Sequence, residues 1–151
     1  ISLGLVGSEM CIRDSSLGAA IGLLAALHFE KEIEGGVKHA YLYGLPRVGN
    51  LEFANSVDKH LKGKLLYTIN GNDLISRVPP RSFGFQHPSG QIWIKHSNGN
   101  DWEFYPGQEN VHGHLTVIPS PNTLANHVGV YYHTLLGWGP ITCPATVNDQ
   151  H

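Results

Sequence analysis

The chain has 151 residues, of which 41% are hydrophobic and 15% charged, and its formal net charge is −2. This size and balance fit one globular domain. The ten Lys and Arg residues are scattered along the chain, so the composition excludes an extended basic surface for nucleic acid.

The first fifteen residues, Ile1–Ser15, show no clean strand alternation. They resemble translated adapter or vector sequence, which should be set aside when a fold is predicted. We therefore treat residues 1–15 as a suspected non-native adapter-like segment. The alternative is a native strand over Ile1–Val6.

A candidate nucleophile follows directly. Ser16 precedes Leu17, Gly18 and a run of small and apolar residues that ends near Leu27. A nucleophile elbow has the pattern Gly-x-Ser-x-Gly, because the strained serine backbone leaves no room for side chains two positions away. Gly18 fills one glycine position and Asp14 stands at the other. The alternative is a serine that caps a buried helix.

The next elements alternate between helix and strand. The run from Leu17 is too short to cross a bilayer, so the sequence predicts a buried helix and no transmembrane segment. In chain order, the patterns predict a helix over Leu17–Lys31, a buried strand over Val37–Tyr43, a turn over Gly44–Gly49 and a helix over Leu51–Lys62 capped by Asn50.

The next strand, Lys64–Ile69, ends in a polar loop that contains Asp73. Asp73 is either a turn residue, whose short side chain bonds nearby amides, or a buried catalytic acid. Further along, Phe83–His87 and Gln91–Lys95 predict a β-hairpin around a short turn. The stretch 96–110 predicts a long surface loop.

Histidines supply the last candidates. His127, in a late loop, is either a structural residue or the base of a serine, acid, histidine order typical of α/β-hydrolases. His112 and His114 would share one face of an extended chain, but no third ligand stands near them. The sequence therefore predicts no metal site and no cofactor.

Several blocks together resemble the fungal class 3 (triacylglycerol) lipase family over about Ser16–Gly139. They are, in chain order, the residues around Ser16, Gly44-Leu45-Pro46-Arg47-Val48-Gly49-Asn50, Asn72-Asp73-Leu74-Ile75-Ser76-Arg77-Val78-Pro79-Pro80, and Phe83-Gly84-Phe85 through Ile94. The resemblance implies the α/β class: a partial α/β-hydrolase fold, namely the C-terminal half of the sheet with flanking helices and a β-hairpin. It also implies Ser16 as nucleophile, Asp73 as acid, His127 as base and the backbone N–H of Leu17 as an oxyanion donor.

The resemblance further implies a secreted carboxylic ester hydrolase that works at a lipid–water interface. Residues 16–139 would be the C-terminal part of a longer lipase domain, without its first strands, its lid or a second oxyanion donor, and residues 140–151 would be a tail. Cys143 would pair with a cysteine upstream of this chain. Such a part would be weakly active or inactive.

Three alternatives stay open. One is a feruloyl esterase-like enzyme on the same scaffold. Another is a non-catalytic fragment that binds lipid surfaces. For Arg47, the alternatives are a structural anchor of its loop and a contact to substrate.

Overall fold

The computed structural model describes residues 10–96, 101–117, 123–131 and 134–135. Within these ranges no helix is long and apolar enough to span a membrane. Cys143 and the predicted tail 140–151 lie outside the described residues.

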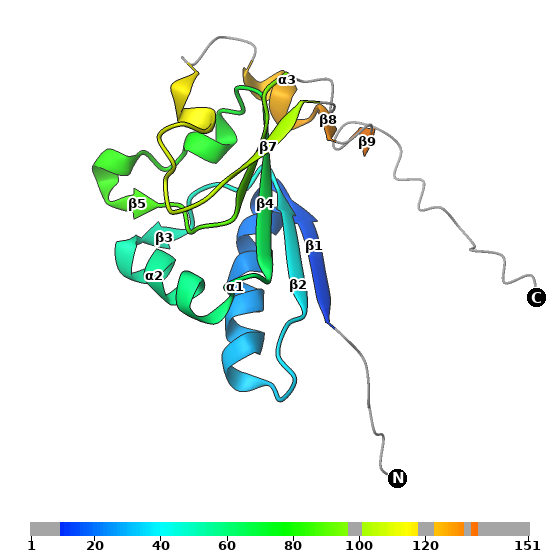
Figure 1. The fold of residues 1–151 in the computed structure, drawn as a ribbon, viewed down its shortest axis with the longest axis vertical. Coiled ribbons are helices and arrows are strands. Elements are labelled where there is room, and N and C mark those ends of the chain that lie inside the picture. Colours follow the sequence, from blue (N-terminus) through cyan, green and yellow to red (C-terminus); the bar gives the residue numbers. More distant parts are fainter. Residues whose placement is uncertain (1–9, 97–100, 118–122, 132–133, 136–151) are drawn as a thin grey trace, which may run out of the picture.

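The centre of the fold is a five-stranded sheet in the order β1-β2-β4-β6-β7 (Figure 1). Four strands are parallel: β1 (Cys11–Ser15), β2 (His39–Tyr43), β4 (Leu65–Asn70) and β6 (Gln91–Ile94). The last strand, β7 (Trp102–Tyr105), is antiparallel to β6. The parallel strands therefore bring their carboxyl ends to one edge of the sheet.

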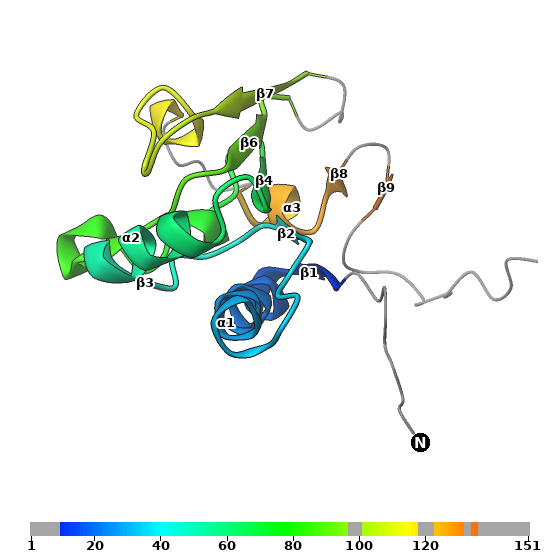
Figure 2. The same ribbon diagram turned by 60° about the horizontal axis from the view of Figure 1, so that its bottom comes forward.

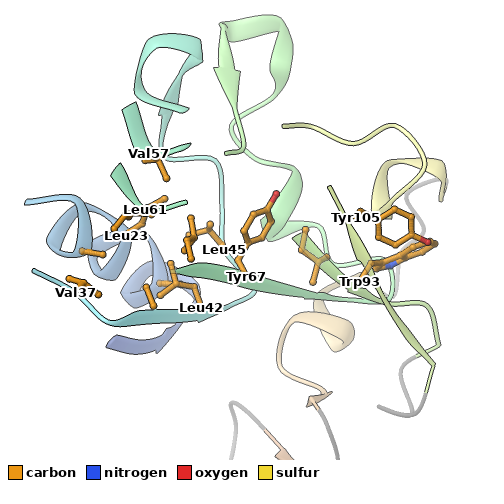
Figure 3. Packing of buried hydrophobic residues seen from close by; sticks show 14 residues of the cluster. Leu23, Val37, Leu42, Leu45, Val57, Leu61, Tyr67, Trp93 and Tyr105 are labelled. Carbon is orange, nitrogen blue, oxygen red and sulfur yellow. The ribbon is translucent and has the colours of Figure 1, made fainter. Parts of the chain in front are cut away.

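Helices α1 (Ser16–Glu32) and α2 (Leu51–His60) connect the first three parallel strands. Both lie on the same side of the sheet, as Figure 2 shows. Successive right-handed crossovers in one direction place their helices on one face. The hydrophobic core lies between these helices and the sheet, with Leu23, Leu42, Val57, Leu61 and Tyr67 among its members (Figure 3).

Small residues let α1 lie close to the sheet. Its buried positions are Ala19, Gly22, Leu23 and Ala26. A Cβ at Gly22 would lie 3.3 Å from side-chain atoms of both Ile12 and Leu42, which is tighter than ordinary contact. The predicted helix is confirmed, but its outer face is not buried, since Leu17, Ile21 and Leu24 are at least half exposed.

Helix α2 begins where its sequence predicts and ends two residues earlier, at His60. Asn50 is the N-cap, and its side-chain Oδ1 accepts a hydrogen bond of 3.0 Å from the Phe53 N–H. The buried residues Ala54 and Val57 lie three positions apart on the inner face. The predicted strands over 37–43 and 64–69 are also confirmed, as β2 and β4.

The predicted hairpin between Phe83–His87 and Gln91–Lys95 is wrong. β5 (Phe85–Gln86) pairs instead with β3 (Gly49–Asn50), while β6 lies between β4 and β7. The antiparallel partner of β6 is β7, which lies within the stretch 96–110 predicted as a loop. Alternation of apolar residues marks a strand but does not identify its partner, and this is why the prediction failed.

Residues 11–15 form a strand although their sequence shows little alternation. β1 is an edge of the described sheet, and only Ile12 in it is partly buried. An edge strand with one covered face needs few apolar residues, so the periodic signal is weak. The non-native origin of residues 1–15 stays a prediction.

Short elements complete the described chain. They are the 3₁₀ helices η1 (Ile75–Arg77), η2 (Arg81–Phe83) and η3 (His114–Thr116), helix α3 (Thr123–His127), and the antiparallel pair β8 (Val130–Tyr131) and β9 (Thr134–Leu135). His127, predicted in a loop, is therefore the last residue of a short helix, and a strand pair comes after it.

The two adjacent leucines of α1 provide a test of the core. Leu23 is fully buried and Leu24 is 50% exposed. We expect Leu23→Ala to lower the free energy of unfolding by about 2–5 kcal/mol, through lost burial and the cavity left behind. Leu24→Ala, with the same chemistry, should change it by about 0.5 kcal/mol or less. Urea denaturation followed by circular dichroism measures both; equal losses would contradict the orientation of α1.

Candidate active site

Three polar side chains from distant parts of the chain meet at the carboxyl edge of the sheet. The Oγ of Ser16 lies 2.7 Å from Nε2 of His127. Nδ1 of His127 lies 2.8 Å from Oδ2 of Asp73. Ser16 starts α1 after β1, Asp73 follows β4, and His127 ends α3. The structure thus brings together the three residues that the sequence singled out.

The turn from β1 into α1 aims the Ser16 hydroxyl at His127. Ser16 has a φ of +56°, a left-handed value that strains any residue with a side chain. A Cβ at Gly18 would lie 2.1 Å from Oδ1 of Asp14, so any other residue there would displace the Asp14 side chain. The N-cap of α1 is Ser15, whose side chain makes no capping bond. Ser16 is therefore not a capping serine, and its geometry is that of an elbow.

Asp73 is fully buried, and its carboxylate has several partners. Oδ1 accepts a hydrogen bond of 2.8 Å from the Ile75 N–H. Oδ2 accepts from His127 and, at 3.4 Å each, from the hydroxyls of Ser76 and Tyr131. One oxygen thus makes the turn, as the first interpretation of Asp73 predicts, and the other holds the imidazole of His127. The role of Asp73 as a catalytic acid stays a prediction.

The protonation pattern of the three residues follows from their partners. An ionised carboxylate can only accept, so Nδ1 of His127 carries the proton that it donates to Asp73. Nε2 is then free to accept from the Ser16 hydroxyl. The His127 side chain is only 8% exposed, which shields this line of hydrogen bonds from water.

Two residues that the sequence did not single out hold the imidazole in place. Gly44, at the end of β2, has a φ of +57°, and a Cβ there would lie 2.8 Å from Nδ1 and Cε1 of His127. The side-chain N–H of Asn70 donates a hydrogen bond of 3.0 Å to the carbonyl of Asn126, fixing α3 to the end of β4. A glycine closing a strand was visible in the sequence, but its contact to a histidine 83 positions later was not.

Tyr131 was also missed. Its ring meets that of Tyr43 edge-on, with centroids 5.7 Å apart, and its hydroxyl faces Asp73. Burial, together with the charge of Asp73, raises the pKa of Tyr131 well above its ordinary value. The phenol therefore stays protonated and remains a donor to the buried carboxylate.

Arg47 is a structural anchor. Its guanidinium forms a buried ion pair with Glu109, in which Nε donates to Oε1 and Nη2 donates to Oε2 over 3.1 Å. Nη1 donates to the backbone carbonyls of Arg77 and Pro79. Burial pulls the pKa of Glu109 upward, but the hydrogen bonds from Arg47 and the His87 N–H lower it overall. These bonds tie the loop of Arg47 to the loop that follows Asp73 and to the loop of Glu109, and all three guanidinium nitrogens of Arg47 have partners within the chain.

Arg77 anchors a fourth segment. Its Nη2 donates to the carbonyls of His114 and, over 2.7 Å, Val117. His114 is buried, whereas His112 is exposed, so the two imidazoles do not share a face as an extended chain would place them. No group of three metal-ligating side chains occurs in the described part of the chain.

Two buried histidines stay neutral beside these arginines. Burial lowers the pKa of His87 to about 4, and burial with the charges of neighbouring groups lowers the pKa of His114 to about 2. The His87 ring stacks on Tyr67 with centroids 5.1 Å apart, and its Nε2 lies 2.8 Å from the Ser76 carbonyl. Ser76 in turn bonds Asp73, so the cluster supports the acid-bearing loop.

Comparisons with known proteins agree with this geometry. The model of the family "Lipase (class 3)" matches residues 9–83. The secreted mono- and diacylglycerol lipase LIP2 of Malassezia restricta is 52% identical over 138 residues, which are 89% of this chain and 42% of that protein. MDL3 of Malassezia globosa, with the same description, is 49% identical over 91% of this chain and 45% of its own length.

Solved structures give the same answer. Lipase II from Rhizopus niveus superposes with a TM-score of 0.74 at 28% identity, covering 85% of this chain and 49% of that one. A structure entitled "A serine protease triad forms the catalytic centre of a triacylglycerol lipase" superposes with a TM-score of 0.73 at 30% identity, covering 86% and 50%.

The fold and the meeting of serine, histidine and aspartate at the edge of a parallel sheet define part of an α/β-hydrolase. The chain belongs to the class 3 lipase family. It spans less than half the length of the curated relatives that it matches. The predicted family and fold class are confirmed.

The ion pair of Arg47 and Glu109 can be tested by removing one charge. We expect Glu109→Gln to lower the free energy of unfolding by about 3–5 kcal/mol, because it leaves the Arg47 guanidinium buried without a counter-charge. Arg81 provides the control, since its Nε lies 3.9 Å from Glu109 and its side chain is 55% exposed. Arg81→Gln should cost about 1 kcal/mol or less. Urea denaturation at neutral pH measures both, and similar losses would contradict the anchoring role.

The neutral buried His87 makes stability depend on pH. The unfolded chain binds a proton at this histidine near pH 6.5, whereas the folded chain resists protonation until about pH 4. The free energy of unfolding should therefore fall as the pH is lowered through this window, by about 3 kcal/mol for a shift of this size. Protonation of His114 lowers the free energy of unfolding further over the same range, because its pKa is also lowered. Glu109 contributes only below about pH 4.5, where the carboxyl begins to bind a proton in the unfolded chain.

Denaturation curves recorded between pH 6.5 and 4.5 check this dependence. His87→Gln should flatten the slope of the unfolding free energy against pH. His112→Gln, at an exposed position close by, should leave it unchanged. A slope that is the same in His87→Gln as in the unsubstituted chain would overturn the assignment.

Proposed function

We propose that the protein to which this chain belongs is a secreted serine hydrolase of acylglycerol esters, with Ser16, His127 and Asp73 as its catalytic residues. The observation that carries the proposal is the hydrogen-bonded line from the Ser16 hydroxyl through His127 to the buried Asp73 carboxylate. The names of the relatives, secreted mono- and diacylglycerol lipases, favour partial glycerides as the first substrates to test.

The proposed reaction has two steps. Ser16 Oγ attacks the ester carbonyl while His127 Nε2 takes its proton, and the tetrahedral intermediate collapses to an acyl-enzyme as His127 returns the proton to the departing alcohol. Water, deprotonated by the same imidazole, then releases the fatty acid and restores Ser16. Asp73 holds the required tautomer and stabilises the imidazolium, a role supported by its complete burial and several donors.

Leu17 supplies one oxyanion donor in this proposal. Its backbone N–H lies in the first turn of α1, where N–H groups have no partner within the helix. The helix dipole adds positive potential at the same point. Loss of a single donor costs roughly 10²–10³ in rate, so a chain without a second donor would be a weak catalyst.

Apolar side chains beside the catalytic residues support action at a lipid–water interface. Leu17 follows Ser16, Leu74 follows Asp73, and Leu124 shares α3 with His127. They are 71%, 41% and 57% exposed. Exposed apolar residues gathered around a catalytic centre favour an oily substrate over a soluble one.

The catalytic role of Ser16 has a direct test. In a polypeptide with the length of the relatives, Ser16→Ala should reduce hydrolysis of a diacylglycerol by a factor on the order of 10⁶ and abolish labelling by a serine-directed phosphonate. Ser15→Ala, at the exposed neighbouring serine, should retain both. Labelling at another residue, or full turnover in Ser16→Ala, would remove the basis of the proposal. Parallel assays with a feruloyl ester distinguish the lipase from the feruloyl esterase-like alternative, because the alternative predicts faster hydrolysis of the feruloyl ester than of the diacylglycerol.

Gly44 provides a test that leaves every catalytic residue in place. In Gly44→Ala the new methyl group would displace His127, and a misplacement of about 1 Å costs roughly 10² in kcat. Gly35→Ala is the matched control, because Gly35 also has a left-handed φ, of +88°, but nothing lies within 4 Å of its Cβ position. Equal kcat values in the two variants would contradict the positioning role of Gly44.

A further inference from the structure

A second concave site lies at the opposite end of the sheet from the catalytic residues. It is a half-open hollow of about 670 Å³, walled by the second half of α2, the start of β4, the turn before β6 and the end of β7. Asp73 follows the carboxyl end of β4, whereas Leu65 and Leu66 in the hollow are its first residues. Occupation of the hollow therefore leaves the catalytic residues unobstructed.

The lining of the hollow is mainly apolar. Val57 and Leu61, labelled in Figure 3, lie behind one wall and are almost completely buried. The apolar surface that a ligand can reach comes from Leu66, Pro106 and the half-exposed ring of Phe104. The size is within the range of sites for small molecules. An apolar hollow of this kind favours a hydrocarbon chain over a polar ligand.

Glycines keep the mouth of the hollow open. Gly63, Gly90 and Gly107 line it, and all three have left-handed φ values. A Cβ at Gly90 would lie 2.6 Å from the Leu65 carbonyl, whereas nothing lies within 4 Å of the Cβ positions of Gly63 and Gly107. The space beside these two glycines is therefore empty of protein atoms.

The charged side chains of the lining favour an anion. Lys59 on α2 and Lys62 just after its end are exposed, and neither belongs to an ion pair among the described residues. The acidic group of the lining, Asp58, is already hydrogen-bonded to protein donors. Its carboxylate accepts from the N–H and hydroxyl of Ser89, both at 2.8 Å, and from the Gln108 amide at 2.7 Å.

We propose that this hollow binds one long-chain fatty acid anion. The alkyl chain lies on Leu66, Phe104 and Pro106, and the carboxylate lies toward Lys59 and Lys62. The choice of ligand rests on the proposed function, because ester hydrolysis at Ser16 releases such an anion. The hollow is thus a product site at a distance from the catalytic residues.

Binding can be measured without catalysis. The Ser16→Ala chain is titrated with a C18 fatty acid whose conjugated double bonds fluoresce on leaving water. We expect saturable binding of one molecule per chain. A C18 alcohol, which lacks the charge, should compete at least about tenfold less well. Absence of binding, or an equally effective alcohol, would overturn the proposal.

Substitutions in the lining locate the ligand. Phe104→Asp should weaken binding at least tenfold, whereas Trp102→Asp, on the same strand but outside the lining, should not. The double variant Lys59→Glu/Lys62→Glu should weaken it similarly, with Lys31→Glu on α1 as the charge control. Melting temperatures confirm that each variant is folded. Equal affinities in Phe104→Asp and Trp102→Asp would overturn the assignment.

The same titration on a polypeptide extended to the length of the relatives tests whether another part of the protein fills the hollow. Retained binding that is lost in Phe104→Asp supports the proposal, and loss of binding on extension overturns it. Failure of this site is distinguishable from failure of the proposed function, because ester hydrolysis and phosphonate labelling depend on Ser16 and not on Phe104.

Discussion

The buried carboxylate of Asp73 is the group on which the site depends. A carboxylate without contact to water must be bonded on every side, and Asp73 draws its donors from three places: its own loop, α3 and β8. Each donor fixes a different segment relative to the end of β4. The requirement to satisfy one anion therefore also positions the imidazole that bridges it to Ser16.

The loop that holds Asp73 needs support of its own, and two arginines provide it. Arg47 and Arg77 together donate to four backbone carbonyls, of Arg77, Pro79, His114 and Val117. Loops have no ladder of neighbouring strands to satisfy such carbonyls, so long side chains with several donors take that role. The hydrophobic core beneath the sheet fixes the strands, while this polar cluster fixes the loops at their carboxyl ends.

Local patterns were enough to predict the parts of the fold that are periodic or capped. The helix after Asn50, the strands β2 and β4, and the chain order of Ser16, Asp73 and His127 could all be derived from the sequence. The pairing of the strands could not be predicted, because the sequence pattern of β6 is the same whether its neighbour is β5 or β7. Gly44 and Glu109 were missed for a related reason. Their roles arise from contacts to residues far along the chain, which no local pattern records.

Strain in the backbone is concentrated where polar side chains must be aimed. Among the described residues, the non-glycine positions with left-handed φ are Ser16 and Glu109. Each such position costs about 1–3 kcal/mol, so it persists only where the surroundings offset that cost. At Glu109 the offset is the ion pair with Arg47 and the bond from the His87 N–H. At Ser16, the first residue of α1 after a largely exposed edge strand, the hydroxyl gains one partner, His127. The contacts of Ser16 therefore offset its strain less than those of Glu109 do, which agrees with the role proposed for Ser16.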